Sequence, residues 1–221
     1  MARRSYGYNP QADIYFEQRG SMDRRPIPVD SVKLDINKFV IGVQDELKDI
    51  TRQMINGTVS PQQWYDRSAG LMKLSYRASI DVARGTNQEM TEEERNRWLA
   101  LLLLLLLLLN GIADGINDGT IDIDYHLVSS ASLRGAAARS MFENWRLASH
   151  LQAGYMEARR VLGIAEHCEE SDDRPGCVDL AALGWIPIEM VVPIGAATCR
   201  DHCKCRIQYR KRLRPLEAFI P

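Results

Sequence analysis

Residues 30–57 read DSVKLDINKFVIGVQDELKDITRQMING, and this stretch points to a helical protein. Its apolar side chains recur every three or four residues, which is the spacing of one helix face. Asn56 and Gly57 are residues with which helices commonly end. The stretch therefore predicts an amphipathic helix over residues 30–56, with its apolar face formed by Val32, Ile36, Phe39, Val40, Val43, Leu47 and Ile50.

Two more helix starts follow within the next forty residues. Ser60 precedes Pro61, which suits the first helical position, and Gln63 can complete a capping box with Ser60. Thr91 and Glu94 have the same spacing and predict a second capping box. The first of these helices is expected to run to Gly85, and the second contains a run of leucines.

The leucine run is the most unusual segment of the chain. Nine consecutive leucines fill Leu101–Leu109, and the apolar stretch begins at Trp98. Twelve apolar residues rise only about 18 Å as a helix, against about 30 Å of membrane hydrocarbon. We therefore expect no membrane span. Because leucine covers every face, either the helix is covered on all sides, for example between subunits, or the leucines are a default assignment and not the true residues.

Glycines punctuate residues 111–119 and predict a break near 115–123. A helical pattern resumes at Leu127 and extends to Leu162, where Gly163 is expected to end it in the left-handed conformation. Within this pattern, Gly135 is followed by three alanines, which predicts the close approach of a neighbouring helix.

Composition and charge limit the possible functions. The chain has 221 residues, of which 45% are hydrophobic, and 28 Lys and Arg against 29 Asp and Glu leave a net charge of -1. This balance disfavours a dedicated nucleic-acid binder with a large basic surface. We expect a mainly α fold, a helical bundle or extended helical hairpins with a small C-terminal module. The predicted units are an extended N-terminal arm over 1–29, a helical domain over 30–163, a Cys/His-rich module over 164–210 and a basic tail over 211–221.

All five cysteines lie in the C-terminal module. They form two groups about 22 residues apart, and such a pair of groups can close one zinc site. The candidate ligands of the first group are His167, Cys168 and Cys177. Those of the second group are Cys199, His202, Cys203 and Cys205.

Two alternatives to structural zinc stay open: disulfides formed in a matured particle, and inert thiols. The first residues carry charge with no apolar stretch behind them and are not expected to be a secretory signal, so a reducing compartment is expected and metal ligation is favoured over disulfides. A catalytic zinc would need an open coordination position and a nearby base. Residues Glu166 and Glu169 are candidates for that base, although loop carboxylates are more often simply solvated.

Other catalytic patterns are missing: the sequence has no Walker loop, no G-x-S-x-G and no H-E-x-x-H. The chain is therefore not expected to be an enzyme. Basic residues gather at its end, and Arg206, Arg210, Lys211 and Arg212 could meet the phosphates of DNA or an acidic protein surface. A solvated basic tail is the alternative.

The C-terminal half resembles the phage head-morphogenesis proteins, the Mu F-like minor head proteins in the broad sense. The resemblance covers about residues 125–210 and rests on a H-C…C pattern, a G-W-x-P turn and a final C-x-C followed by an aromatic residue. The chain departs from the family in a longer acidic insertion over 169–176. The segments that carry the resemblance are Ala165–Cys168, Cys177, Leu180–Ile188, Pro193–Gly195, Thr198–Cys199, Cys203–Arg206 and Tyr209, with Leu133–Arg139 upstream.

The resemblance implies a minor structural protein of a tailed-phage head. Such a protein is made in the host cytoplasm, is built into the virion near the portal or capsid shell, and binds capsid or portal proteins as well as copies of itself. The expected zinc ligands are Cys168, Cys177, Cys203 and Cys205, with Cys199 and His167 as substitutes. The alternatives are a metal-dependent nuclease or hydrolase that uses the Cys/His site and a zinc-stabilised DNA-binding module.

Overall fold

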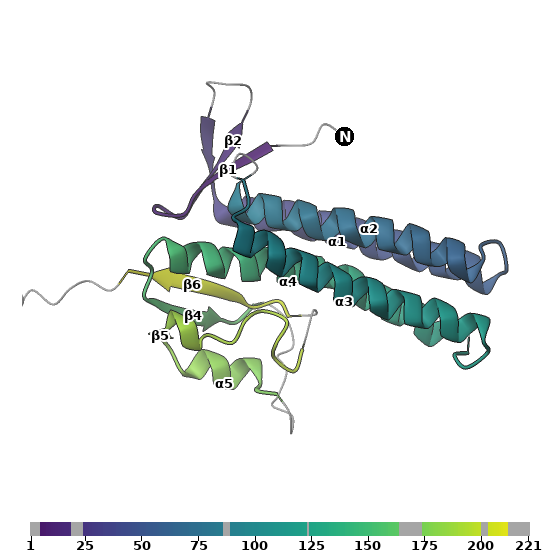
Figure 1. The fold of residues 1–221 in the computed structure, drawn as a ribbon. Coiled ribbons are helices and arrows are strands. Elements are labelled where there is room, and N and C mark those ends of the chain that lie inside the picture. Colours follow the sequence, from purple (N-terminus) through teal and green to yellow (C-terminus); the bar gives the residue numbers. More distant parts are fainter. Residues whose placement is uncertain are drawn as a thin grey trace, which may run out of the picture.

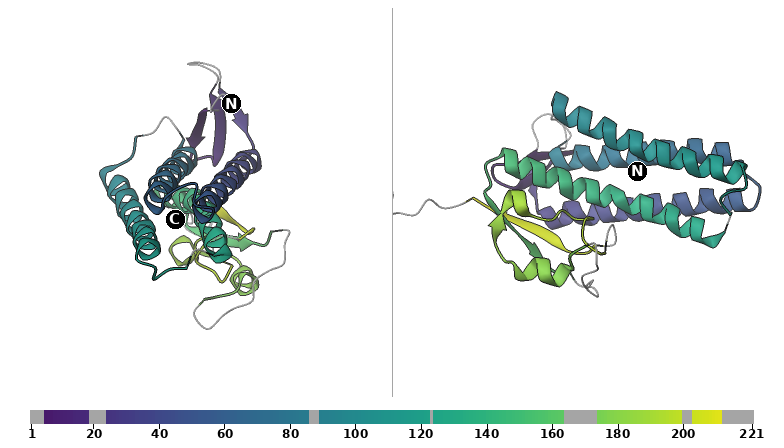
Figure 2. Two further views of the ribbon diagram at one scale, coloured as in Figure 1. Left: turned by 90° about the vertical axis from the view of Figure 1, so that its right-hand side faces the viewer. Right: turned by 60° about the horizontal axis from the view of Figure 1, so that its bottom comes forward.

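A computed structural model of the chain describes residues 5–18, 24–85, 89–122, 124–163, 174–199 and 203–211. Helices dominate, as predicted. Four long helices run alongside one another, a small sheet packs near one end of them, and a second small sheet with a short helix lies against α4 (Figures 1 and 2). The four long helices are α1 (Val29–Ile55), α2 (Pro61–Arg84), α3 (Glu92–Asn117) and α4 (Tyr125–Gln152).

The predicted helix starts are confirmed. The Ser60 hydroxyl accepts from the backbone N–H of Gln63, and the Gln63 side chain accepts from the Ser60 N–H. Thr91 and Glu94 make the same reciprocal pair at the start of α3. Each capping box satisfies two backbone donors that the first helical turn leaves without partners.

The bundle core lies between α1, α2 and α4, and α3 packs on α2. A Cβ atom added to Gly135 on α4 would lie 3.2 Å from the Gln44 Cα of α1. The predicted close helix approach at Gly135 is thus present.

The prediction of an extended N-terminal arm is wrong for the described part of residues 1–29. These residues form an antiparallel sheet of β1 (Ser5–Asn9), β2 (Ile14–Gln18) and β3 (Arg24–Ile27). Its aromatic side chains explain why it folds: Tyr15 is fully buried, stacks on Tyr8 at 4.4 Å and donates to the Ala83 carbonyl. The strands are short, so their alternation gives little signal in the sequence.

The predicted helix over 127–162 also ends too late. Helix α4 stops at Gln152, and Gly154 takes the left-handed conformation at φ 79°. Strand β4 (Glu157–Val161) follows, with buried and exposed side chains in alternation. Gly163 therefore ends a strand segment and has no left-handed φ.

Strand β4 belongs to the C-terminal module, so the predicted boundary at residue 164 lies too late. It is the central strand of an antiparallel sheet in the order β5 (Ile186–Pro187), β4, β6 (Arg206–Arg210). Helix α5 (Cys177–Ala182) and a short 3-10 helix, η1 (Ile188–Met190), complete the module. Its buried residues form a hydrophobic core separate from that of the bundle.

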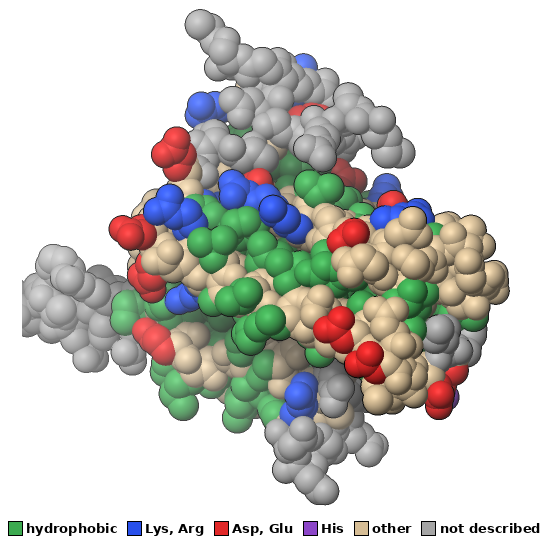
Figure 3. All heavy atoms as spheres, turned by 45° about the vertical axis from the view of Figure 1, so that its right-hand side comes forward, with side chains coloured by type: hydrophobic (Ala, Val, Ile, Leu, Met, Phe, Trp, Pro, Cys, Tyr) green, Lys and Arg blue, Asp and Glu red, His purple; other side chains and the backbone are tan. Residues whose placement is uncertain are grey.

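The leucine run lies on α3, which the described residues cover on one side. Leu102, Leu105 and Leu109 are buried, whereas a parallel stripe stays open, with Leu103, Leu104, Leu107 and Leu108 each more than half exposed. Hydrophobic side chains also form a band across the face of the molecule in Figure 3. The described part of the chain therefore does not cover α3 on all sides.

By length and composition alone, α3 is able to cross a membrane, because the helix extends beyond the leucine run and has 26 residues in total. The expected absence of a membrane span stays a prediction. A packed helix of a soluble protein can have the same length and apolar composition, and the buried side of α3 packs on α2.

Candidate metal centre

Three buried cysteine thiols meet in the core of the C-terminal module. Cys177 is the first residue of α5, and Cys203 and Cys205 lie in the segment that leads into β6. The three Sγ atoms lie within 4.8 Å of one another, and those of Cys177 and Cys203 are 3.8 Å apart. Sulfurs about 2.3 Å from a tetrahedral zinc lie about 3.8 Å apart, so this cluster has the size of a metal site.

A fourth cysteine adjoins the cluster. The Sγ of Cys199 lies 3.4 Å from that of Cys177, and Cys199 is only partly buried. None of these four thiols forms a disulfide with another of them. The predicted ligands Cys168 and His167 lie outside the described residues, as does His202. The structure therefore brings together three of the four expected ligands and places the substitute Cys199 beside them.

Arg160 of β4 enters this cluster from the sheet side. Its Nη1 donates to the Cys203 Sγ at 3.3 Å and lies 3.8 Å from the Cys177 Sγ. Its Nη2 donates to the carbonyls of Val192 and Pro193 at 2.7 and 3.3 Å. The sequence reasoning missed this residue, because an arginine in a short strand carries no signal of a buried role.

The charge of Arg160 needs a counterion. Its side chain is 5% exposed, and among the described residues it pairs with no carboxylate. A buried charge is costly unless an opposite charge compensates it. Thiolates bound to a metal supply that charge, since a divalent cation with three or four thiolates keeps a net negative charge. A buried cluster of neutral thiols would leave Arg160 without compensation.

The backbone beside the cluster is packed closely. A Cβ atom on Gly163 would lie 2.2 Å from the carbonyl oxygen of Lys204, which is far inside van der Waals contact. Only glycine lets the end of β4 pass the segment between Cys203 and Cys205 at this distance. Gly163 thus has a packing role in place of the helix-ending role predicted for it.

The three thiols of the trio are shielded from solvent. Cys177, Cys203 and Cys205 are each 2% exposed or less. A catalytic zinc keeps one position open for water or substrate, whereas structural sites fill all four positions with protein ligands. The burial of these thiols therefore suits a structural ion. The candidate bases Glu166 and Glu169 lie outside the described residues.

A second buried polar cluster joins the three parts of the fold. Arg146 of α4 contacts Asp13 of the β1–β2 turn at 3.1 Å and Glu143 at 3.5 Å. Glu143 also accepts from Lys33 of α1 at 2.9 Å. His150 is fully buried, contacts Asp13 at 3.1 Å and stacks on Tyr209 of β6, with ring centroids 3.8 Å apart. We call these groups the polar junction.

The polar junction shifts the pKa of its acidic groups. Burial opposes ionisation of Glu143, but the charges of Lys33 and Arg146 outweigh it and hold the pKa of this carboxyl below its usual value. Burial also opposes ionisation of Asp13, and here the hydrogen bond from His150 and the charge of Arg146 lower the pKa. Asp13 therefore is a charged partner that links the N-terminal sheet to α4, and Glu143 is one that links α1 to α4.

The predicted DNA contacts are largely engaged within the chain. Arg210 pairs with Glu157 at 2.6 Å and lies over the Trp185 ring. Lys211 donates to the carbonyl and side-chain oxygens of Gln11. Arg206 lies 3.7 Å from Asp30, and Arg212 falls outside the described residues.

The chain matches no family model, no curated protein and no solved structure.

Proposed function

We propose that the chain is a structural assembly protein of a tailed-phage head, with a C-terminal module held together by one zinc ion. The observation that carries the zinc assignment is the buried trio of Cys177, Cys203 and Cys205, with the guanidinium of Arg160 in contact with Cys203. Zinc suits this donor set because it accepts tetrahedral thiolate ligands and has no redox chemistry of its own. The fourth ligand comes from Cys168, Cys199 or His167.

The closed cluster favours a structural role over a catalytic one. A nuclease or hydrolase would need a solvent-accessible position on the ion, and the three thiols are buried. In a module of this size a metal ion replaces much of the stabilisation that a larger core would supply. The chain is thus proposed not to be an enzyme.

The assembly role is supported by the open side of α3. Its exposed leucines follow each other at helical i, i+4 spacing, so that Leu103 and Leu107 form one row and Leu104 and Leu108 the next. Soluble monomers seldom expose contiguous apolar patches of this kind, and such patches mark interaction sites. We propose that this row packs against copies of the chain or other head proteins in the virion.

The test is co-assembly. The full chain is produced in bacteria together with the capsid and portal proteins of its phage, and the products are separated on a sucrose gradient. The chain is expected in the particle fractions. A Leu103→Glu/Leu107→Glu variant should stay at the top of the gradient, since two charges on the apolar row oppose its burial.

The matched control is Leu183→Glu, which adds a charge at an exposed leucine of the C-terminal module. This variant should enter particles like the unaltered chain, and circular dichroism should show that all variants fold. If particles form but their gradient fractions do not contain the unaltered chain, the assembly role is contradicted.

A further inference from the structure

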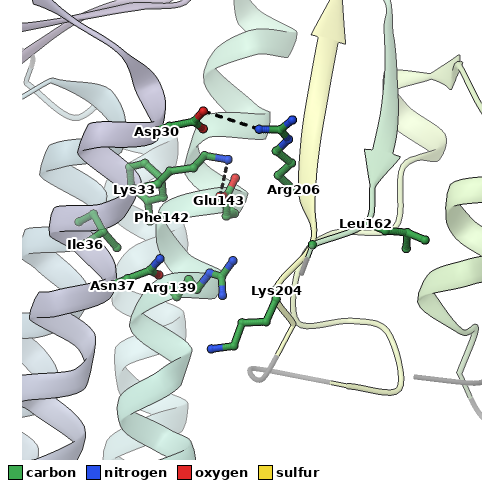
Figure 4. A pocket seen from close by; sticks show the side chains of 11 residues that line it. Asp30, Lys33, Ile36, Asn37, Arg139, Phe142, Glu143, Leu162, Lys204 and Arg206 are labelled. Atoms are coloured by element: carbon green, nitrogen blue, oxygen red, sulfur yellow. Dashed lines mark ion pairs between the residues drawn. The ribbon is translucent and has the colours of Figure 1, made fainter. Parts of the chain in front are cut away.

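A hollow of about 330 Å³ lies between the bundle and the C-terminal module (Figure 4). Helices α1 and α4 form one wall, and the segment from Lys204 into β6 forms the other. We call it the seam pocket. Its charged lining residues are Asp30, Lys33, Arg139, Glu143, Lys204 and Arg206.

The acids of the seam pocket do not neutralise its cations. Glu143 is buried and already pairs with Lys33 at 2.9 Å and with Arg146, which lies outside the pocket lining. Asp30 is mostly exposed and lies 3.7 Å from Arg206, at the long end of an ion pair. Water screens such exposed pairs strongly.

Two cations of the pocket form no ion pair within the described part of the chain. Among the described residues, neither Arg139 nor Lys204 pairs with a carboxylate, and Arg139 makes only a 3.5 Å contact to the Cys205 carbonyl. Figure 4 shows Arg139 reaching from α4 and Lys204 extending from the opposite wall toward the helices. Both charges therefore converge on one space.

The lining selects the chemistry of the ligand. Guanidinium groups present forked donors that match the oxygens of a phosphate, and an ammonium adds a point charge. Asn37 adds an amide at the rim. The ring of Phe142 is 1% exposed and offers no face on which a base can stack. The volume lies near the lower end of small-molecule sites, which suits a phosphate with few attached atoms.

We propose that the seam pocket binds a phosphate group, with Arg139 and Lys204 as its principal ligands. The position of Lys204 is prearranged, because the buried Cys203 and Cys205 flank it and Gly163 packs on its carbonyl. The phosphate comes either from a soluble phosphate compound or from the backbone of a nucleic acid. Both sources present the same oxygens to these side chains.

The test uses the full chain and two probes. Isothermal titration measures binding of inorganic pyrophosphate at fixed ionic strength, and fluorescence anisotropy measures binding of a labelled duplex oligonucleotide. At least one probe should bind. The Arg139→Gln/Lys204→Gln variant should bind that probe with an affinity at least about tenfold lower, since two charge-assisted hydrogen bonds are lost.

The matched control is Lys48→Gln/Arg97→Gln, which removes the same charge from helix positions outside the pocket lining and should leave the affinity unchanged. Lys204→Gln alone guards against a folding defect in the double variant. Pyrophosphate binding alone identifies a soluble ligand, and DNA binding lost in the double variant identifies the nucleic-acid backbone. If neither probe binds, or if the double variant binds like the control, the seam pocket is not a phosphate site.

Discussion

The Nη1 atom of Arg160 lies 3.3 Å from the Sγ atom of Cys203, so a guanidinium from β4 sits within the thiol cluster. The charge of Arg160 has no carboxylate partner among the described residues, and thiolates bound to a metal ion would compensate it. The same contact ties the sheet to the cysteine segment. Arg160 is therefore the residue through which the metal centre and the fold of the module depend on each other.

Replacing Arg160 by glutamine should weaken zinc binding about 10- to 100-fold, which is the usual effect of losing a group that supports metal ligands. The measurement is competition with a chromophoric zinc chelator. Arg159→Gln is the control, because Arg159 lies on the opposite face of the same strand over Trp185. Equal zinc affinity in the two variants would show that Arg160 does not support the ligands.

Gly163→Ala should disrupt the cysteine segment, because the new methyl group would meet the Lys204 carbonyl at 2.2 Å. The backbone on one side has to move, and the sulfurs of Cys203 and Cys205 move with it. We expect lower zinc affinity and a lower melting temperature. Gly111→Ala serves as control, since it adds the same methyl group to open space on α3. A melting temperature of Gly163→Ala equal to that of the control would refute the packing role.

Acid should unfold the protein through the polar junction. Asp13 and Glu143 have a lowered pKa in the folded state, so the unfolded state takes up protons first as the pH falls. The stability that they contribute is fully present above their unfolded pKa of about 4 and is lost below it, toward the folded pKa. The free energy of unfolding, measured in urea between pH 6 and 3, should therefore fall steeply below pH 4.

The variant for this prediction is Glu143→Gln. Its free energy of unfolding should be lower than that of the unaltered chain at pH 6 and should fall less steeply below pH 4. Glu93→Gln, at an exposed position of α3, should behave like the unaltered chain. A pH profile of Glu143→Gln as steep as that of the unaltered chain would assign acid unfolding to other groups.

The N-terminal sheet should be part of the cooperative fold. Tyr15→Ala removes a fully buried ring and its bond to Ala83, so the free energy of unfolding should drop by about 3 kcal/mol or more. Ile14→Ala, on the exposed side of the same strand, should lower the free energy of unfolding far less. Urea denaturation measures both variants. A small effect of Tyr15→Ala would mean that the sheet is dispensable and would restore the idea of an independent arm.

Long amphipathic helices and their caps were predictable because each rests on local spacing. The apolar positions of α1 and the capping boxes of α2 and α3 need no tertiary information. Strand β4 was not predictable, since EARRV has helix-forming residues and becomes a strand only by pairing with β6. The N-terminal sheet could not be predicted for a similar reason: its burial depends on contacts with α1 and α2.

The cysteines of the candidate site were predictable from residue type and spacing, and the structure gathers Cys177, Cys203 and Cys205. Arg160 was not, because its role depends on which face of β4 turns inward. The seam pocket was equally hidden, since Arg139 and Lys204 lie 65 positions apart and meet only after the module docks on α4.

The central claim is that the thiol cluster holds a structural metal ion, and native mass spectrometry of the full chain, purified without chelator, tests it most directly. We expect one zinc per chain, and its loss in Cys177→Ser and in Cys203→Ser. Cys168→Ser, Cys199→Ser and His167→Ala then show which residue completes the shell. A folded chain whose mass contains no metal, with or without oxidised cysteines, would contradict the account.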